Sequence, residues 1–254
     1  MLSYLLFKTL LEKLVSMTSS PEILREKPEK IRSMFDAIAP TYDLLNHLLS
    51  FGMDIRWRKK AVALLKEKEG GTFLDIAAGS GDVSLALLSL NPRHIIGSDF
   101  APNMLNVFQQ KLQRYKNSDC IELVSCDAHE LPFIDRSFDA TIAAFGIRNF
   151  ADRLLALREM HRVLKPNGIS LILELSTPKT PVVKQFYYLY SRIGLPLFGK
   201  FISRHNAAYR YLPDSIAQFP DQQEFLSMIR QAGFREANSY ALTFGAATIY
   251  VGRK

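Results

Sequence analysis

The segment from Gly71 to Phe100 constrains the fold of this 254-residue chain more strongly than any other. A short apolar run, Phe73–Ala77, precedes a turn of small residues, Ala78–Gly81, and apolar residues at helical spacing follow over Val83–Leu90. A second apolar run then ends at Asp99. This order predicts a strand, a tight turn, a helix and a parallel strand, the unit that binds adenosine-bearing cofactors.

The turn indicates which cofactor the unit binds. Gly79 and Gly81 let the backbone approach a ligand closely. Asp99, with Phe100 beside it, ends the second strand, where a carboxylate can accept the hydroxyls of a ribose. A dinucleotide site needs a third glycine before a helix that binds a diphosphate, but here the anionic Asp82 begins the helix. We therefore expect S-adenosylmethionine, which carries no phosphate; an ordinary turn without a ligand is the alternative.

Composition sets the broad class of the protein. The chain is 48% hydrophobic and long enough for one large α/β domain, and no apolar run is long enough to span a membrane. The two cysteines, Cys120 and Cys126, make neither a disulfide framework nor a zinc site, so we expect both on one buried face of a strand in a cytoplasmic protein. The net charge of +7 predicts an anionic neighbour, either nucleic acid or a lipid surface.

Residues 1–30 are predicted to be a variable N-terminal arm and linker, followed by one domain over residues 31–254. Within the arm, Met1–Met17 has apolar residues at helical spacing interrupted by charges, which indicates an amphipathic helix rather than a secretory signal. Such a helix can lie on a membrane or on the protein body.

The first part of the domain, residues 31–65, has helical periodicity interrupted near Pro40 and Gly52. A front segment of this kind can fold over the mouth of a cofactor site. It ends in a basic cluster, residues 56–60, which is either a solvated helix face or a surface-binding patch.

After Asp99 the chain alternates between helical and strand patterns, which predicts a mostly parallel, seven-stranded sheet with a C-terminal antiparallel strand. Ligands of such sheets bind at the carboxyl ends of the strands. The expected elements are helices at 101–115, 153–164 and 221–232, and strands at 121–126, 138–144, 169–175, 234–240 and 243–251.

Residues 176–213 break this alternation. They contain no Asp or Glu and mix basic with aromatic side chains, a composition that suits an apolar substrate pocket or an anionic bilayer surface. We expect a helical insert over the active site, at about residues 176–220. A helical insert with a merely mixed, exposed face is the alternative.

Several short motifs point to one family. They are YDLLN (42–46) with SFG (50–52), LPF (131–133), FGIRN (145–149), RVLKPNG (162–168) and YRYLPDSI (209–216). From about residue 30 onwards the chain resembles the ubiquinone/menaquinone biosynthesis C-methyltransferases, and FGIRN and YRYLPDSI are the specific motifs. The resemblance implies a Rossmann-like class I methyltransferase that uses S-adenosylmethionine to methylate a ring carbon of a demethylmenaquinol or a polyprenyl benzoquinol.

The resemblance also implies cofactor contacts. The family's positions fall on the Ser80 hydroxyl, on Asp99 for the ribose, and on Asp127 and Ala128 beside the adenine. Asp127 stands where relatives often have asparagine, and it can still accept from the adenine amino group. A family hydroxyl falls on Ala144, so that hydrogen bond is missing here or is made by backbone.

Arg148 is the principal catalytic candidate that the resemblance implies. A guanidinium stays protonated, so Arg148 would stabilise a phenolate or orient a water that takes the proton; a structural ion pair is the alternative role. Asn149 would hold the same oxygen, and Tyr42 would close over the methyl donor. No metal is expected. Three histidines are candidate bases, each equally explained as a surface or capping residue: His47, His129 and His205.

Other functions remain open from the sequence. A class I methyltransferase can act on another small molecule or on RNA, and a related protein can bind S-adenosylmethionine without catalysis. Base-methylating enzymes usually carry an Asn/Asp-Pro-Pro-aromatic run after the fourth strand, which this chain lacks there, so we expect no nucleic-acid partner. The expected partners are a polyprenyl quinol, the inner face of an anionic membrane and a second copy in a homodimer. The motifs do not separate naphthoquinol from benzoquinol substrates.

Overall fold

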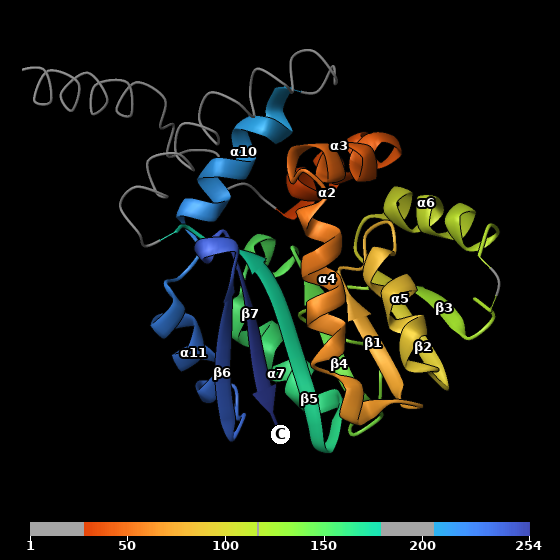
Figure 1. Ribbon diagram of the computed structural model, residues 1–254, viewed down its shortest axis with the longest axis vertical. Helices are drawn as coiled ribbons and strands as arrows, with labels where there is room; N and C mark the ends of the chain where they lie inside the picture. The colour runs from red at the N-terminus through yellow and green to blue at the C-terminus, as the bar shows by residue number, and fades with distance from the viewer. Residues whose placement is uncertain (1–27, 116, 179–205) are drawn as a thin grey trace, which may run out of the picture.

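Seven strands form one sheet in the part of the chain that the structure, a computed structural model, describes: residues 28–115, 117–178 and 206–254 (Figure 1). The strands are β1 (Thr72–Ile76), β2 (His94–Asp99), β3 (Ile121–Ser125), β4 (Phe138–Ala144), β5 (Leu164–Leu175), β6 (Glu236–Leu242) and β7 (Ala247–Arg253). Their order is β3-β2-β1-β4-β5-β7-β6, and β7 alone runs in the direction opposite to the other six. The predicted fold class is confirmed.

The central strands are covered by helices on both faces. In β1, Phe73 packs into the cluster on one face and Leu74 into the cluster on the other, because successive side chains of a strand alternate. The described helices are α2 (Pro28–Ile38), α3 (Tyr42–Leu49), α4 (Met53–Ala63), α5 (Asp82–Leu87), α6 (Pro102–Leu112), α7 (Arg153–Val163), α10 (Asn206–Ala217) and α11 (Gln222–Gln231). Helices α4 and α5 pack on the Phe73 side, and α7 and α11 on the Leu74 side.

Helices α2, α3 and α4, called the front helices here, are separated at the two predicted positions. Pro40 lies in a short 3-10 turn between α2 and α3. Gly52 precedes α4 with a φ of 71°, a left-handed conformation that glycine adopts without steric cost. Figure 1 shows α2 and α3 gathered with α10 at one end of the sheet.

The fifth strand is longer than predicted. β5 begins at Leu164, opposite Phe138, and the register then shifts until Ile169 lies opposite Ala140. The intervening residues contain Asn167, whose φ of 61° lets the longer strand accommodate its extra residues. The RVLKPNG motif therefore contains both the end of α7, at Val163, and the start of β5, at Leu164.

The prediction that Cys120 and Cys126 share a buried strand face is wrong. Both residues lie just outside β3, and both are half-buried free cysteines. β3 pairs only with β2 and stands at the edge of the sheet, so its two faces are incompletely covered.

Two predicted segments lie mainly outside the described residues: the N-terminal arm, 1–30, and the helical insert, 176–220. Of the first, only the start of α2 is described, and of the second, residues 176–178 and 206–220, which include α10. Among the described helices, none has the length and apolar character needed to cross a bilayer.

Candidate active site

A pocket opens at the carboxyl ends of β1, β2 and β4. It is also lined by residues of α2, by Tyr42, the first residue of α3, and by Asn149. The predicted cofactor residues along its wall are Gly79, Asp99, Phe100, Asp127, Ala128 and Ala144.

The carboxylate of Asp99 is oriented by the backbone around it. The N–H of Gly79 donates to Oδ2 at 2.8 Å, and the N–H of Ala101 donates to Oδ1 at 2.8 Å. Burial raises the pKa of Asp99, and the N–H groups of Ala101 and Gly79 act in the opposite direction. Each carboxylate oxygen keeps a second lone pair, so the group can accept from both hydroxyls of a ribose.

The glycine turn packs tightly on α6. Ala77, Gly79 and Gly81 all have positive φ angles, of 53°, 57° and 87°. A Cβ on Gly81 would lie only 2.1 Å from the ring of Phe108 in α6. Gly81 is therefore required by packing against Phe108, whereas Gly79 is the glycine that lines the cavity.

The Ser80 hydroxyl is engaged with the front helices. Ser80 is buried, and its Oγ donates to Oδ1 of Asp43 in α3. Lys111 of α6 binds the other oxygen of Asp43 at 2.6 Å. These contacts hold α3 against the turn, where a Cβ on Gly79 would lie 3.9 Å from the Tyr42 ring.

Arg148 is buried in an ion pair with Glu174 of β5. Its Nη1 lies 2.8 Å from Oε1 of Glu174, its backbone N–H donates to Oε2 at 3.1 Å, and Nη1 also donates to the Phe145 carbonyl. Nε donates to Oγ of Ser215 at 3.3 Å. Burial lowers and Glu174 raises the pKa of Arg148, with a net upward shift. The ion pair named as the alternative role is present, and participation of Arg148 in catalysis stays a prediction.

Asn149 and Tyr42 both reach the cavity. Oδ1 of Asn149 accepts from the Tyr211 hydroxyl of α10 at 2.8 Å, which leaves its amide NH₂ as a donor. Burial raises the pKa of Tyr42, and the positive charge of Arg148 lowers it. Both side chains therefore offer neutral hydrogen-bonding groups at the cavity wall.

Comparison with known proteins decides the family. The model of the ubiE/COQ5 methyltransferase family matches residues 23–254. This chain belongs to that family. The ubiquinone/menaquinone biosynthesis C-methyltransferase UbiE of Geobacter sp. (strain M21) is 47% identical over 91% of this chain and 99% of its own length. The demethylmenaquinone methyltransferase of Bacteroides fragilis is 43% identical over 90% of this chain and 94% of its own.

Solved structures share the fold of this methyltransferase. A SAM-dependent methyltransferase from Thermotoga maritima aligns over 87% of this chain and 98% of its own, with a TM-score of 0.61 and 19% identity. One from Aquifex aeolicus aligns over 76% and 88%, with a TM-score of 0.56 and 18% identity. The predicted family and cofactor, S-adenosylmethionine, are confirmed, and the cavity with its oriented Asp99 carboxylate fits that cofactor.

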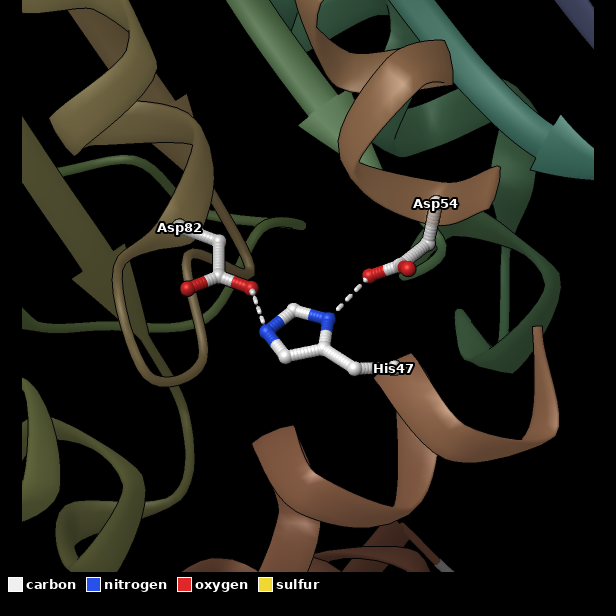
Figure 2. A group of neighbouring side chains, drawn as sticks. All are labelled: His47, Asp54 and Asp82. Atoms are coloured by element: carbon white, nitrogen blue, oxygen red, sulfur yellow. Dashed lines mark hydrogen bonds and ion pairs between the residues drawn. The ribbon is translucent and has the colours of Figure 1, made fainter. Parts of the chain in front are cut away.

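His47 of this methyltransferase is held between two carboxylates (Figure 2). Its Nδ1 lies 2.7 Å from Oδ2 of Asp54, and its Nε2 lies 3.8 Å from Oδ2 of Asp82. The three side chains are close enough to hold a metal ion. However, Nη1 of Arg58 pairs with Asp54 and lies 3.4 Å from Asp82, so a cation already stands between these carboxylates. The site therefore favours an ion-pair network over a metal.

His129 lies at the cavity, but its two ring nitrogens are already bonded within the described structure. Nε2 accepts the backbone N–H of Asp152 at 3.1 Å, so the proton of the neutral ring belongs on Nδ1, 2.5 Å from Oδ1 of Asp127. A ring held in this way is poorly placed to accept a substrate proton. His205, the third candidate base, lies outside the described residues.

Sequence reasoning did not single out Asp75, a carboxylate in the middle of the buried strand β1. Ser84 donates to its Oδ2 at 2.7 Å, while Oδ1 has no hydrogen-bond partner among the described residues. Burial raises the pKa of Asp75 to about 7, although Ser84 acts against this shift. Its signal in the sequence is an acidic residue inside an apolar strand just before the glycine turn.

Asp75 should make the stability of the cofactor-free protein fall as pH rises from about 4 to 7. In that range the folded protein keeps a proton that the unfolded chain, with the ordinary pKa of 3.8, has lost. We expect Asp75→Asn to stabilise the protein at pH 8 by about 2–4 kcal/mol and to leave its stability at pH 4 nearly unchanged. Thermal melting from pH 4 to pH 8 measures this, with exposed Asp119→Asn as the control. Parallel melting profiles for Asp75→Asn and wild type would contradict it.

Proposed function

We propose that this methyltransferase transfers a methyl group from S-adenosylmethionine to a ring carbon of a polyprenyl quinol. The observation that carries the proposal is that the oriented Asp99 carboxylate and the family-specific residue Asn149 line one cavity. The relatives from Geobacter and Bacteroides, named for C-methylation in quinone biosynthesis and for demethylmenaquinone methylation, support the substrate class.

The cofactor residues divide according to their chemistry. Asp99 accepts the ribose hydroxyls, and Asp127 and Ala128 stand beside the adenine. Gly79 lets the backbone come close to the ligand, and Ser80 acts through Asp43, which holds α3 in place. S-adenosylmethionine, when bound, supplies an electrophilic methyl group.

The quinol must become an electron-rich phenolate before its ring carbon can be methylated. We assign to the amide NH₂ of Asn149 a hydrogen bond to the phenolic oxygen. The buried positive charge of Arg148 stabilises the phenolate electrostatically from behind the cavity wall. Since neither guanidinium nor amide accepts a proton, water is the acceptor in this scheme. Tyr42 closes the cavity and excludes bulk water from the reacting groups.

We also propose that the protein works at the cytoplasmic face of an anionic membrane. The net charge of +7 and the low water solubility of a polyprenyl chain support this location. A homodimer stays a prediction.

The substrate can be tested directly. The purified protein is incubated with methyl-labelled S-adenosylmethionine and either a short-chain demethylmenaquinol or the matching benzoquinol, under reducing conditions. We expect label on a ring carbon of at least one quinol, located by mass spectrometry and NMR. Label on oxygen, or on added RNA instead of both quinols, would contradict the proposal.

A further inference from the structure

Helix α3 directs two of its polar side chains, together with the buried Leu45, toward the protein body. Asp43 is held by Ser80 and Lys111. His47, one turn later, is held by Asp54, and Figure 2 shows its ring directed between α4 and α5. A surface helix of a globular protein normally keeps its large apolar side chains inward and its polar side chains toward water.

The outward side of the same helix is apolar. Leu44 is 63% exposed and Leu48 is 48% exposed. Two large apolar side chains that follow in the chain are also exposed: Phe51 in the turn after α3 (78% exposed) and Ile55 in the first turn of α4 (42% exposed). Single exposed apolar residues are ordinary, but four large ones within residues 44–55 indicate an interaction surface.

Exposed basic side chains follow on α4. Arg56, Lys59 and Lys60 of α4 are exposed. Arg58 belongs instead to the interior ion-pair network, and Asp54, the acidic residue of α4, is buried with it. The exposed side of α4 therefore presents positive charge without an acidic side chain from that helix to neutralise it.

We propose that these side chains form a docking surface for an anionic lipid bilayer. Its apolar members would enter the interfacial region, while its basic members would meet lipid phosphates. The choice of a bilayer rests on the proposed function, because the proposed substrate, a polyprenyl quinol, is dissolved in the bilayer. The docking surface consists of Leu44, Leu48, Phe51, Ile55, Arg56, Lys59 and Lys60.

The position of α3 connects this surface with the cavity. Tyr42, the first residue of α3, lines the cavity, and Leu44 and Leu48 follow on the outward side of the same helix. Figure 1 shows α2 and α3 together at the end of the molecule where α10 also lies. A bilayer in contact with α3 would lie beside the cavity wall, so an apolar quinol could reach the site with little exposure to water.

Vesicle co-sedimentation of the full-length protein tests the docking surface. The vesicles are phosphatidylcholine, alone or with phosphatidylglycerol, and the variants are Leu44→Ser/Leu48→Ser and Lys59→Gln/Lys60→Gln. We expect wild type to prefer the anionic vesicles, and the serine pair to weaken binding about tenfold. The glutamine pair should weaken binding about fivefold for each charge removed and reduce its dependence on salt. Ile134→Ser is the matched control, since Ile134 is 82% exposed in the loop that leads into the amino-terminal end of β4, whereas the cavity lies at the carboxyl ends of the strands.

If both double variants bound the anionic vesicles as strongly as wild type does, the proposal would be overturned. Any bilayer contact would then belong to other parts of the chain. A monomer–dimer shift in the serine pair without loss of vesicle binding would overturn it in favour of a contact between two copies. Thermal melting establishes that each variant is folded. Activity on a water-soluble, short-chain quinol without vesicles tests the proposed function separately, and it should be the same in wild type and both pairs.

Discussion

Replacing Asp99 by alanine is expected to weaken S-adenosylmethionine binding by at least about 100-fold. Asp99 can accept two ribose hydroxyls, and a hydrogen bond to a charged group contributes about 1.5–3 kcal/mol. The substitution also removes the acceptor for the backbone N–H groups of Gly79 and Ala101, which shape the cavity wall. Isothermal titration calorimetry with S-adenosylmethionine measures the loss.

Asp99→Asn provides the graded comparison, because an amide keeps one acceptor oxygen but replaces the other with a donor. Its affinity should fall between those of wild type and Asp99→Ala. Asp119→Ala removes an exposed carboxylate, and this variant should bind S-adenosylmethionine as wild type does. An unchanged dissociation constant in Asp99→Ala would remove Asp99 from the cofactor site.

Replacing Arg148 by alanine is expected to affect both stability and turnover. It would leave the Glu174 carboxylate buried without its partner, a change that destabilises proteins by about 3–5 kcal/mol. The double variant Arg148→Met/Glu174→Gln removes both charges at similar volume, so it should recover most of this stability. If the positive charge of Arg148 stabilises the phenolate, turnover of the double variant should still be about 100-fold below wild type.

The readouts are urea unfolding, single-turnover methyl transfer and calorimetric affinity for S-adenosylmethionine. Affinity should stay near the wild-type value in the double variant, which separates a catalytic loss from a binding loss. Lys165→Met is the control, since it breaks the surface ion pair with Asp139 at the start of β5 and should change little. Wild-type turnover in the double variant would reduce Arg148 to a structural role.

The strand–turn–helix–strand unit could be predicted because local spacing specifies it. Alternation of apolar runs with helical periodicity and two glycines in one turn places Gly79 and Asp99 at the same edge of any parallel sheet. The burial of the edge strand β3 was harder to predict, because it depends on which strands lie beside it in the sheet. That explains the error over Cys120 and Cys126, whose spacing alone suggested a shared buried face.

The order of amino acids by itself determined the α/β fold, the family motifs and the choice of cofactor, because each depends on residues close together in the chain. Only the tertiary structure decided how individual side chains are used. It pairs Arg148 with Glu174, ties Ser80 to Asp43, and places buried Arg58 beside Asp82 while its basic neighbours stay exposed. The physical reason is that a buried charge or hydroxyl must find a partner, and these partners are distant in the chain or lie on neighbouring elements that meet only after folding.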